Sequence, residues 1–321
     1  MSLKNKTILL TGGVGSFGKK FVSIALKEHD PYSIRVYDIN ELGLVEMRRH
    51  FKDKRLRFLI GDVRDRNRLK RAMNNVDLVV HAAALKHVDM CEYNPIEAVR
   101  TNIEGAMNVV DAAIDNNVAK VINISTDKAA YPVNLYGASK MVAEKLFIQG
   151  NTYVSANKET IFSCTRYGNV LGSSGSVIPL FQKQKEQGKI KITDENMTRF
   201  WLKIEDGVNF VIKSINMMKG GEIFIPKIKS MKIMDLAEAI APGVKKEIIG
   251  IRPGEKIHEV LLTKEEARHS KAYKDYFVVC PEFSFWKDEK DSGCQLDSSF
   301  EYSSDTNEDK LVKEDLKKII N

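Results

Sequence analysis

Short apolar segments and amphipathic helical segments alternate along the first half of the chain. The apolar segments are rich in Val, Ile and Leu, which suits strands buried on both faces of a sheet. They lie at Thr7–Leu10, Ile34–Tyr37, Leu56–Ile60, Val76–Val80, Val118–Ile124 and Ile161–Cys164. Between two of them, helical periodicity runs from Ile96 through Ala112. Strands alternating with helices predict an α/β fold with a doubly wound parallel sheet of the Rossmann type.

The regular alternation ends near residue 168, within the loop-like segment 166–172. Beyond it, helices and short strands mix, as expected of a smaller α+β portion over the crevice of the sheet. Helices are predicted at Ile178–Glu186 and Ile204–Met217, strands at Lys189–Ile192 and Glu222–Ile225, and a last amphipathic helix, with Leu311, Leu316, Ile319 and Ile320 on its apolar side, within Ser303–Asn321.

Composition narrows the class of protein. The 321 residues are 43% apolar, which is enough for one large or two modest domains. The net charge of +7 is spread along the chain rather than clustered with aromatic residues, so we expect a phosphate-bearing substrate and no nucleic acid; an ordinary basic surface explains the charge equally well.

Cysteine spacing and hydropathy give two further expectations. The four cysteines are far apart and show no metal-ligand spacing, which predicts free thiols, a reducing compartment and no metal. No signal-peptide core is visible, and no apolar run approaches the roughly 20 residues needed to span a bilayer. We therefore expect a soluble cytoplasmic protein without membrane contact.

A glycine-rich segment, Thr11–Gly18, follows the first predicted strand and opens a helix. Glycines at this spacing permit a tight turn, close approach of the backbone to a pyrophosphate and close helix packing, and the helix amino terminus favours an anion. The residues predicted to contact a dinucleotide are Gly12, Gly15, Ser16, Phe17 and Gly18. On this basis residues 1–168, with helix 204–218, form the dinucleotide-binding domain, and residues 169–321 form the interleaved substrate-binding portion.

The ends of the next strands extend the predicted cofactor site. Asp38 ends the second strand and can accept hydrogen bonds from the adenosine ribose, whereas it would repel a 2′-phosphate; this favours NAD over NADP. Asp62, with Val63 beside it, either meets the adenine or caps the helix that starts near Arg64. Ala82 and Ala83 end the fourth strand, where small side chains let a cofactor lie against the backbone.

The segment Ser125–Lys140 carries the predicted chemistry, because it follows a buried strand at the edge where open α/β sheets bind ligands. Tyr136 and Lys140 lie one helical turn apart, so the lysine can favour the phenolate and make the tyrosine a base. An amphipathic surface helix would give the same spacing. Asp127 and Lys128, an acid and a base directly upstream, make the catalytic interpretation stronger.

Arginines suited to a diphosphate are Arg199 and Arg252, the second in the charged turn Arg252–His258. For either of them a surface ion pair is the competing interpretation. Lys86, after the fourth strand, either faces a substrate or is solvated, and its sequence context favours solvation.

These motifs resemble the extended short-chain dehydrogenase/reductase family, and within it the soluble inverting UDP-N-acetylglucosamine 4,6-dehydratases of pseudaminic acid biosynthesis. The resemblance covers nearly the whole chain. It implies UDP-N-acetylglucosamine as substrate, NAD(P) regenerated in each turnover, a homo-oligomer, and substrate contacts at Lys86, Asn169, Arg199, Arg252 and Glu255. It rests on Thr11–Gly18, Ala82–Val88, Glu92–Pro95, Ser125–Ala129, Tyr136–Lys140, Arg166–Val170, Gly175–Pro179, Met197–Phe200 and Arg252–Lys256.

The chain departs from the family at the second strand. A Ser-Arg pair with a nearby lysine commonly holds the 2′-phosphate of NADP there, whereas this chain has Asp38-Ile39 and Gly43. We therefore predict NAD where the family usually takes NADP.

The resemblance also implies a mechanism. Tyr136, its pKa lowered by Lys140, takes the proton of the carbon-4 hydroxyl, which Thr126 orients. Lys128, neutral because burial or Lys140 depresses its pKa, removes the carbon-5 proton, and protonated Asp127 donates to the departing carbon-6 hydroxyl. Reprotonation of carbon 5 from the opposite face, by Tyr136, inverts it. A UDP-sugar 4-epimerase or a retaining 4,6-dehydratase is the nearest alternative, and a non-catalytic dinucleotide sensor is a more distant one.

Overall fold

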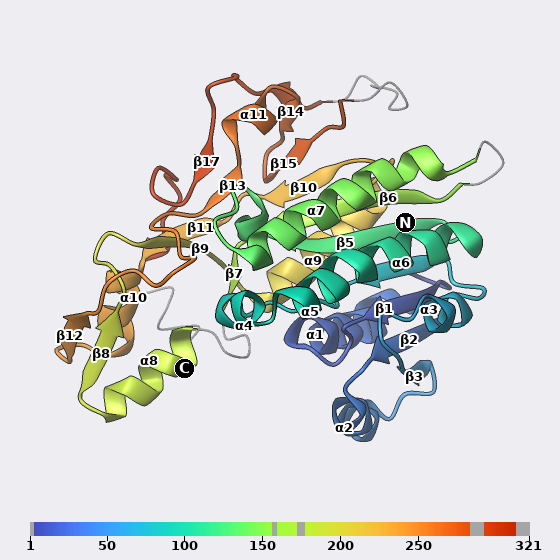
Figure 1. The fold of residues 1–321 in the computed structure, drawn as a ribbon, viewed down its shortest axis with the longest axis horizontal. Coiled ribbons are helices and arrows are strands. Elements are labelled where there is room, and N and C mark those ends of the chain that lie inside the picture. Colours follow the sequence, from blue (N-terminus) through green and yellow to red (C-terminus); the bar gives the residue numbers. More distant parts are fainter. Residues whose placement is uncertain (1–2, 156–158, 172–176, 283–291, 313–321) are drawn as a thin grey trace.

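The large sheet of the protein has the strand order expected of a dinucleotide-binding fold (Figure 1). The computed structural model describes residues 3–155, 159–171, 177–282 and 292–312. Within them, six parallel strands follow the order β3-β2-β1-β4-β5-β6, which reverses between β1 and β4. These strands are β1 (Thr7–Thr11), β2 (Ser33–Asp38), β3 (Leu56–Ile60), β4 (Leu78–His81), β5 (Lys120–Thr126) and β6 (Ile161–Tyr167). The predicted doubly wound fold is confirmed.

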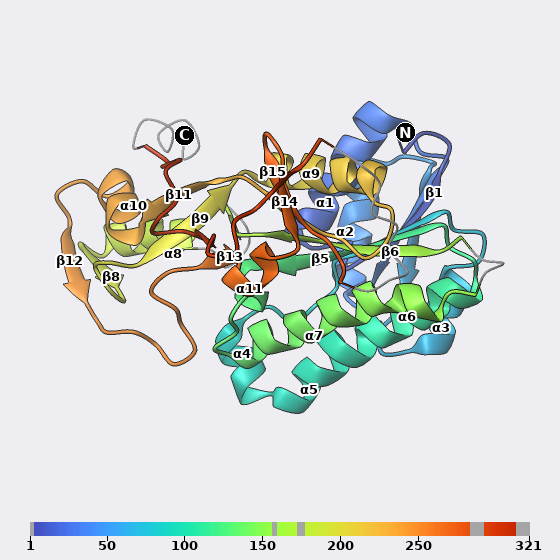
Figure 2. The same cartoon turned by 90° about the horizontal axis from the view of Figure 1, so that it is seen from above.

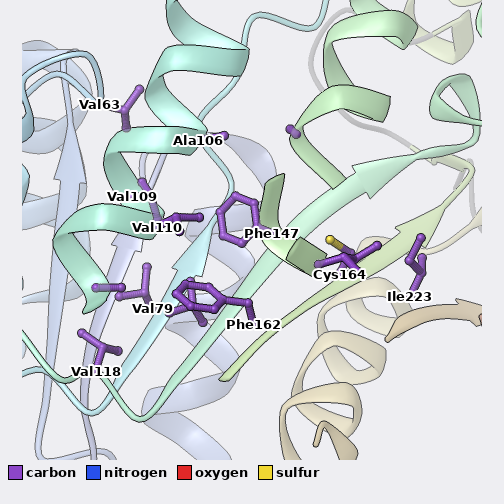
Figure 3. Packing of buried hydrophobic residues seen from close by; sticks show 14 of the residues in the cluster. Val63, Val79, Ala106, Val109, Val110, Val118, Phe147, Phe162, Cys164 and Ile223 are labelled. Atoms are coloured by element: carbon purple, nitrogen blue, oxygen red, sulfur yellow. The ribbon is translucent and has the colours of Figure 1, made fainter. Parts of the chain in front are cut away.

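Helices cover both faces of this sheet, which is why its strands are almost entirely apolar. One face packs against α1 (Ser16–Ile24), α2 (Glu41–Phe51) and α9 (Ile204–Met217). The other face packs against α3 (Arg66–Ala72), α6 (Gly105–Asp115) and α7 (Leu135–Gly150). Figure 3 shows this second layer, where Phe147 of α7 meets Phe162 of β6 edge to face at 6.1 Å between ring centroids. The two layers make the sheet edge a rigid platform for a site.

The segment predicted as one helix from Ile96 is divided in the structure. It consists of α4 (Val88–Tyr93), α5 (Pro95–Val99), a π-helical turn over 100–104, and α6. The π-helical turn turns Asn102 inward, where it is buried and its amide accepts from the Leu85 N–H and donates to the Ser139 hydroxyl. Asn102 thereby ties the loop after β4 to α7, a function that helical periodicity alone does not reveal.

The smaller portion lies beside the large sheet in both views (Figures 1 and 2). Its apolar core joins Phe181, Ile190, Trp201 and Leu236. Its elements are β7 (Asn169–Val170), α8 (Val177–Glu186), β8 (Lys189–Ile192), β9 (Thr198–Leu202), β11 (Lys229–Lys232), α10 (Ile233–Ile240) and β12 (Lys245–Ile248). The predicted helix and strand positions in this portion agree closely with the structure.

The large sheet continues beyond the sequence boundary that we predicted at residue 168. Four later strands extend it after β6, the first parallel and the rest antiparallel. They are β10 (Ile223–Pro226), β15 (Tyr276–Val279), β14 (Ser270–Ala272) and β16 (Cys294–Gln295). Only β10 was expected, because the other three are short and lack a clear apolar period. The two portions are thus interleaved through the sheet itself.

A short segment near the site closes the fold. β13 (Val260–Leu262) pairs with β17 (Tyr302–Ser303), and α11 (Lys264–Ala267) follows β13. The segment 166–172 was predicted as a loop, but Arg166 and Tyr167 end β6 and Asn169 begins β7. Gly175, Ser176 and the predicted carboxy-terminal helix beyond residue 312 lie outside the described residues.

Disulfides, metal sites and membrane-spanning helices can be checked in the described part of the chain. All four cysteines are free thiols. Within the described ranges no cluster of three His, Cys, Asp or Glu side chains could hold a metal ion. No helix in these ranges is long and apolar enough to cross a bilayer.

Candidate active site

A cavity of about 1410 Å³ extends along the carboxyl ends of the parallel strands and into the smaller portion. Nearly all of the predicted site residues line it. They are Gly12, Gly15, Ser16, Phe17, Asp38, Asp62, Val63, Ala82, Ala83, Lys86, Thr126, Lys128, Tyr136, Lys140, Asn169, Arg199, Arg252 and Glu255. Two predicted site residues, Gly18 and Asp127, do not line the cavity.

The glycine-rich loop is shaped by close backbone contacts. Gly12 has φ +66°, and a Cβ on it would lie 2.7 Å from the Ala83 nitrogen. A Cβ on Gly18 would lie 2.2 Å from the Gly13 carbonyl oxygen, so α1 can approach the loop only because position 18 is glycine. Gly15, at the amino terminus of α1, has no side chain to cap the helix, and it lines the cavity. The loop therefore offers helical N–H groups to an anion in the cavity.

Asp38 is held at the rim of the cavity by backbone donors. Its Oδ2 accepts from the Val14 N–H at 3.1 Å and its Oδ1 from the Asn40 N–H at 3.0 Å. Both oxygens retain a lone pair for a further donor. The carboxylate is thus fixed beside the glycine loop, where the sequence predicted a ribose contact.

Asp62 does not cap α3, which was one of the two interpretations of this residue from the sequence. It accepts from the Arg64 N–H at 2.9 Å, while Asp65 caps α3 through the Arg68 N–H. Burial alone would raise the pKa of Asp62, but its hydrogen bonds from Arg64 hold that pKa below the ordinary value. Asp62 is therefore an ionised residue at the cavity wall, and its adenine contact stays a prediction.

The turn Asp127–Ala129 brings the predicted catalytic residues together between β5 and α7. Asn134 caps α7 by accepting from the Gly137 N–H at 2.7 Å. A Cβ on Gly137 would lie only 2.2 Å from the Lys128 carbonyl oxygen, so glycine allows the first turn of α7 to press on this segment. That packing places Tyr136 next to Thr126 and Lys128.

The sequence led us to expect a lowered pKa for Tyr136, but the structure gives the opposite direction. Burial raises the pKa of Tyr136 to about 12, although Lys128 and a hydrogen bond from Thr126 lower it in part. Burial also lowers the pKa of Lys140 to about 8. We expected Lys140 to make Tyr136 a base near neutral pH, but sequence spacing could not show how deeply the pair is buried.

Lys128 differs from expectation in the same way. Burial would depress its pKa, as predicted, but the carboxylates of Asp127 and Glu259 more than reverse that effect and raise the pKa above the ordinary value. The Lys128 Nζ lies 3.0 Å from Asp127 Oδ1 and 3.4 Å from Glu259 Oε1. Lys128 is therefore an ammonium in the protein alone, and must lose a proton before it can act as a base.

Asp127 was expected to act as a protonated acid, and that role stays a prediction. Its side chain is fully buried, and burial raises its pKa. Its Oδ1 accepts from the Thr126 hydroxyl and from Lys128, both at 3.0 Å, whereas its Oδ2 has no hydrogen-bond partner among the described residues. Thr126, which does line the cavity, connects Asp127 to it.

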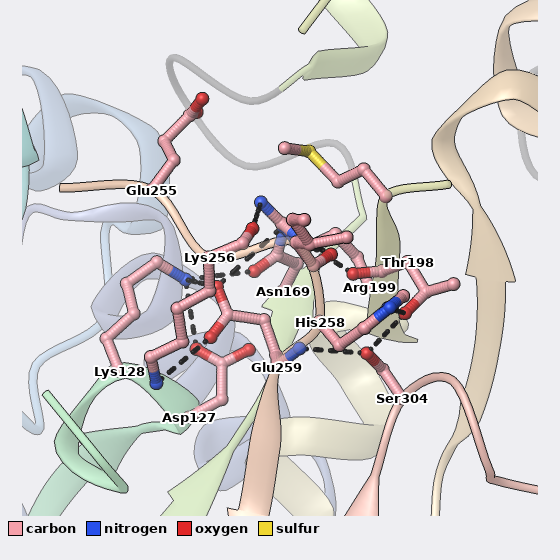
Figure 4. Close-up of polar contacts among 12 residues, drawn as sticks. Asp127, Lys128, Asn169, Thr198, Arg199, Glu255, Lys256, His258, Glu259 and Ser304 are labelled. Carbon is pink, nitrogen blue, oxygen red and sulfur yellow. Dashed lines mark hydrogen bonds and ion pairs between the residues drawn. The ribbon is translucent and has the colours of Figure 1, made fainter. Parts of the chain in front are cut away.

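Glu259 is the residue that sequence reasoning missed. Its side chain is 2% exposed and lies between Lys128, Arg199 and Lys256 (Figure 4). In the sequence it directly follows the charged turn Arg252–His258 and precedes the apolar run Val260–Leu262. That position is typical of the start of a strand. The only sequence signal for a role of Glu259 in the site was a carboxylate at the edge of a charged turn.

The predicted substrate residues lie around this cluster but differ in their contacts. Arg199 is buried and donates to the carbonyl oxygens of Thr198, Ile257 and Lys256. Arg252 pairs with Glu255. Asn169 Oδ1 lies 3.5 Å from Lys128 Nζ, and burial lowers the pKa of Lys86. Contact of these residues with the substrate, and of Arg199 and Arg252 with its diphosphate, stays a prediction. The hydrogen bonds of Arg199 also fix the 256–257 backbone.

The family model described as polysaccharide biosynthesis protein matches residues 8–281. The chain belongs to this family. It is 48% identical, over 98% of this chain and 97% of the relative, to the UDP-N-acetylglucosamine 4,6-dehydratase (inverting) of Campylobacter jejuni. It is also 44% identical, over 86% of this chain and 83% of the relative, to the UDP-glucose 4-epimerase of Rickettsia canadensis.

Among solved structures, Pen from Bacillus thuringiensis has the same fold, with a TM-score of 0.89 and 39% identity over 100% of this chain and 99% of that one. The resemblance drawn from the sequence motifs is thereby confirmed, and so is the fold of the extended short-chain dehydrogenase/reductases.

Proposed function

We propose that this family member is an inverting UDP-N-acetylglucosamine 4,6-dehydratase, a lyase whose product is UDP-2-acetamido-2,6-dideoxy-β-L-arabino-hexos-4-ulose. The observation that carries the proposal is the placement of Thr126, Asp127, Lys128 and Tyr136 around one end of the cavity, at the end of β5. Loss of water from a sugar needs both an acid and a base, and this cluster supplies them. The name of the Campylobacter relative, at 48% identity, supports the same substrate.

A nicotinamide dinucleotide fits the other end of the cavity. Gly18 lets α1 approach the loop, Gly12 lets the loop approach Ala82 and Ala83, and the uncapped start of α1 suits a pyrophosphate. When bound, the cofactor supplies a reversible store for the hydride that leaves carbon 4 and returns at carbon 6. Gly15, Ser16 and Phe17 would hold its phosphates, and Ala82 and Ala83 would flank it.

We propose NAD as the preferred cofactor, because the anchored Asp38 carboxylate would repel a 2′-phosphate. The dissociation constants of NAD and NADP for the apoprotein test this preference, and NAD is expected to bind more tightly. In Asp38→Asn, which keeps the side-chain shape but removes the charge, the preference should narrow. NADP binding tenfold more tightly than NAD to the unmodified protein would contradict the proposal.

The chain's own residues then divide the proton transfers. Tyr136, once it is a phenolate, takes the carbon-4 hydroxyl proton while Thr126, hydrogen-bonded beside it, orients that hydroxyl. The carbon-4 ketone acidifies the carbon-5 proton, which Lys128 removes once its amine is neutral. Asp127 gives its proton to the departing carbon-6 hydroxyl, with Thr126 as the hydroxyl between Asp127 and the cavity. Tyr136 returns a proton to carbon 5 from the opposite face, which inverts that centre.

The test is incubation of the NAD-loaded protein with UDP-N-acetylglucosamine, followed by mass spectrometry of the nucleotide sugar. We expect a product lighter by one water, with no net consumption of NAD, and no such product from Lys128→Ala. A product of unchanged mass would instead favour a UDP-sugar 4-epimerase, the activity named for the Rickettsia relative.

The proposal also includes a homo-oligomer, an expectation that rests on the family resemblance. Light scattering of the purified protein would give its mass in solution. A monomer at micromolar concentration would contradict this part of the proposal.

A further inference from the structure

Glu259 lies against the predicted acid and base, although it belongs to a segment more than 100 residues away in the sequence. Its Oε1 is 3.4 Å from the Lys128 Nζ and 3.7 Å from the Arg199 Nε, and its Oε2 is 3.5 Å from the Lys256 Nζ. Oε2 makes no hydrogen bond to any described residue. A buried carboxylate that is charged but incompletely bonded is common at functional sites.

The backbone of Glu259 is fixed independently of its side chain. Its N–H donates to the Ser304 hydroxyl at 2.9 Å, and its carbonyl oxygen accepts from the Ser304 N–H at 2.8 Å. The Ser304 hydroxyl also bonds the Thr198 hydroxyl at 2.6 Å, which in turn bonds His258 Nδ1 at 2.8 Å. Figure 4 shows this chain of contacts beside the charged cluster. The carboxylate is therefore held at a fixed distance from Lys128.

The charges in this cluster are unequal in number. Three cations, Lys128, Arg199 and Lys256, surround two carboxylates, Asp127 and Glu259. If Glu259 carried no charge, Asp127 would be the one carboxyl group of this cluster left to face the three cations. It would then be held as a carboxylate, and a carboxylate cannot donate a proton to a leaving hydroxyl.

We propose that Glu259 is a positioning residue: its carboxylate is the counter-ion of the Lys128 ammonium and so lets Asp127 keep the proton that the elimination needs. This inference rests on the proposed function for the use of that proton, but not for the charge arrangement itself. In agreement with this geometry, the Glu259 charge acts to raise the pKa of both Asp127 and Lys128.

The same charge has a cost at Lys128. The Glu259 charge makes the Lys128 amine a stronger base, but it also lowers the fraction of the amine that is neutral at a given pH. Loss of the Glu259 charge would make Lys128 a weaker base but leave more of it neutral, so the two effects on the maximal rate oppose each other. The same loss would lower the pKa of both Asp127 and Lys128. The position of the pH profile, rather than its height, is the property that Glu259 controls.

The test compares the unmodified protein with Glu259→Gln, which keeps the shape and removes the charge. Glu265→Gln, an exposed carboxamide substitution six residues further along, is the matched control. The side-chain carbon adjacent to the Lys128 amine is followed by NMR in NAD-loaded protein with ¹³C-labelled lysine, and Lys128→Met assigns its signal. Its titration midpoint should fall by at least one pH unit in Glu259→Gln and stay unchanged in Glu265→Gln.

A second variant removes a positive charge from the cluster, whereas Glu259→Gln removes a negative one. Lys256→Met removes a cation 3.5 Å from Glu259, so the Lys128 midpoint should rise. This variant keeps the inference testable if Glu259→Gln fails to fold. A Lys128 midpoint that does not move in either variant overturns the inference.

The pH dependence of turnover separates this inference from the proposed function. With UDP-N-acetylglucosamine, both limbs of the profile should move to lower pH in Glu259→Gln, whereas a merely structural role would lower the rate without moving them. A shifted NMR midpoint together with no turnover by the unmodified protein would reject the substrate and uphold the charge arrangement. Normal turnover with superimposable profiles would overturn the inference and leave the function intact.

Discussion

Two ionic clusters in the described part of the chain are bonded very differently. In the first, which we call the Arg166 cluster, the guanidinium of Arg166 bonds Glu144 at 2.9 and 2.6 Å and Glu266 at 2.9 and 2.8 Å. Both oxygens of both carboxylates are used. Because Glu144 belongs to α7 and Glu266 to α11, the Arg166 cluster joins the helix of Tyr136 to the carboxy-terminal segment.

The second, the Lys128 cluster of Asp127, Lys128 and Glu259, has contacts of 3.0 to 3.4 Å. One oxygen of each carboxylate lacks a hydrogen-bond partner among the described residues. A buried carboxylate costs free energy when it is incompletely paired, so the folded protein gains less from the Lys128 cluster. The comparison shows that the Arg166 cluster stabilises the platform, while the Lys128 cluster keeps bonding capacity for chemistry.

The largest expected effect is on chemistry, in the Lys128 cluster. Asp127→Asn removes the proton donor, so loss of water should slow by roughly 10²–10⁴-fold, the usual contribution of a general acid. The thermal midpoint should change little, because a protonated Asp127 carries no charge and asparagine keeps its shape. Turnover assays and calorimetry of the same preparation check both parts; turnover within threefold of the unmodified rate would remove Asp127 from the mechanism.

The largest expected effect on stability is in the Arg166 cluster. Arg166→Met leaves Glu144 and Glu266 buried without their cation, which should reduce the free energy of unfolding by about 3–5 kcal/mol in urea titrations. Adding Glu144→Gln and Glu266→Gln to this variant should restore part of the loss. A single variant as stable as the parent would show that the two clusters do not differ as described.

The Arg166 cluster should also give stability a distinct pH dependence. Although burial opposes it, Arg166 lowers the pKa of Glu266 to about 2 from its ordinary value of 4.5. Since the folded-state pKa is the lower one, its contribution of up to about 3 kcal/mol is present above pH 4.5 and is lost as the pH falls towards 2. The stability difference between the parent and Glu266→Gln, measured by denaturation at several pH values, should shrink over that window; a constant difference would contradict it.

The smallest expected effect concerns the hydroxyl that connects the Lys128 cluster to the cavity. Thr126→Val keeps the shape but deletes the bond to Asp127, and a neutral hydrogen bond contributes about 1 kcal/mol, so turnover should fall roughly fivefold. Thr126→Ser keeps the hydroxyl and should retain most of the rate. Equal rates for the valine and serine variants would exclude a role for the hydroxyl.

The two clusters also differ in how far the sequence could predict them. Asp127, Lys128 and Tyr136 are close in the sequence and follow an apolar strand, so their meeting at one strand end could be predicted. The partners of Arg166 lie 22 residues before it and 100 residues after it, and no local pattern connects them.

The sequence could not show how far a side chain is buried or which charged residues from distant segments lie beside it. The doubly wound parallel sheet followed from the alternation of apolar and helical segments, whereas the antiparallel strands β14 to β16 are too short to show a period. The expected pKa directions at Tyr136 and Lys128 were wrong for a related reason. They were inferred from near neighbours, and the depth of burial at Tyr136 and the charge of Glu259 are tertiary properties.

The central claim is that the Lys128 cluster removes a proton from carbon 5 during loss of water. Incubation with UDP-N-acetylglucosamine in deuterated water, followed by proton NMR, tests it most directly. The account predicts a 6-deoxy methyl signal, deuterium at carbon 5, and coupling constants of the inverted L-arabino configuration. A 6-deoxy product that retains its original carbon-5 proton would contradict the account, and so would a galacto-configured sugar that keeps its carbon-6 hydroxyl.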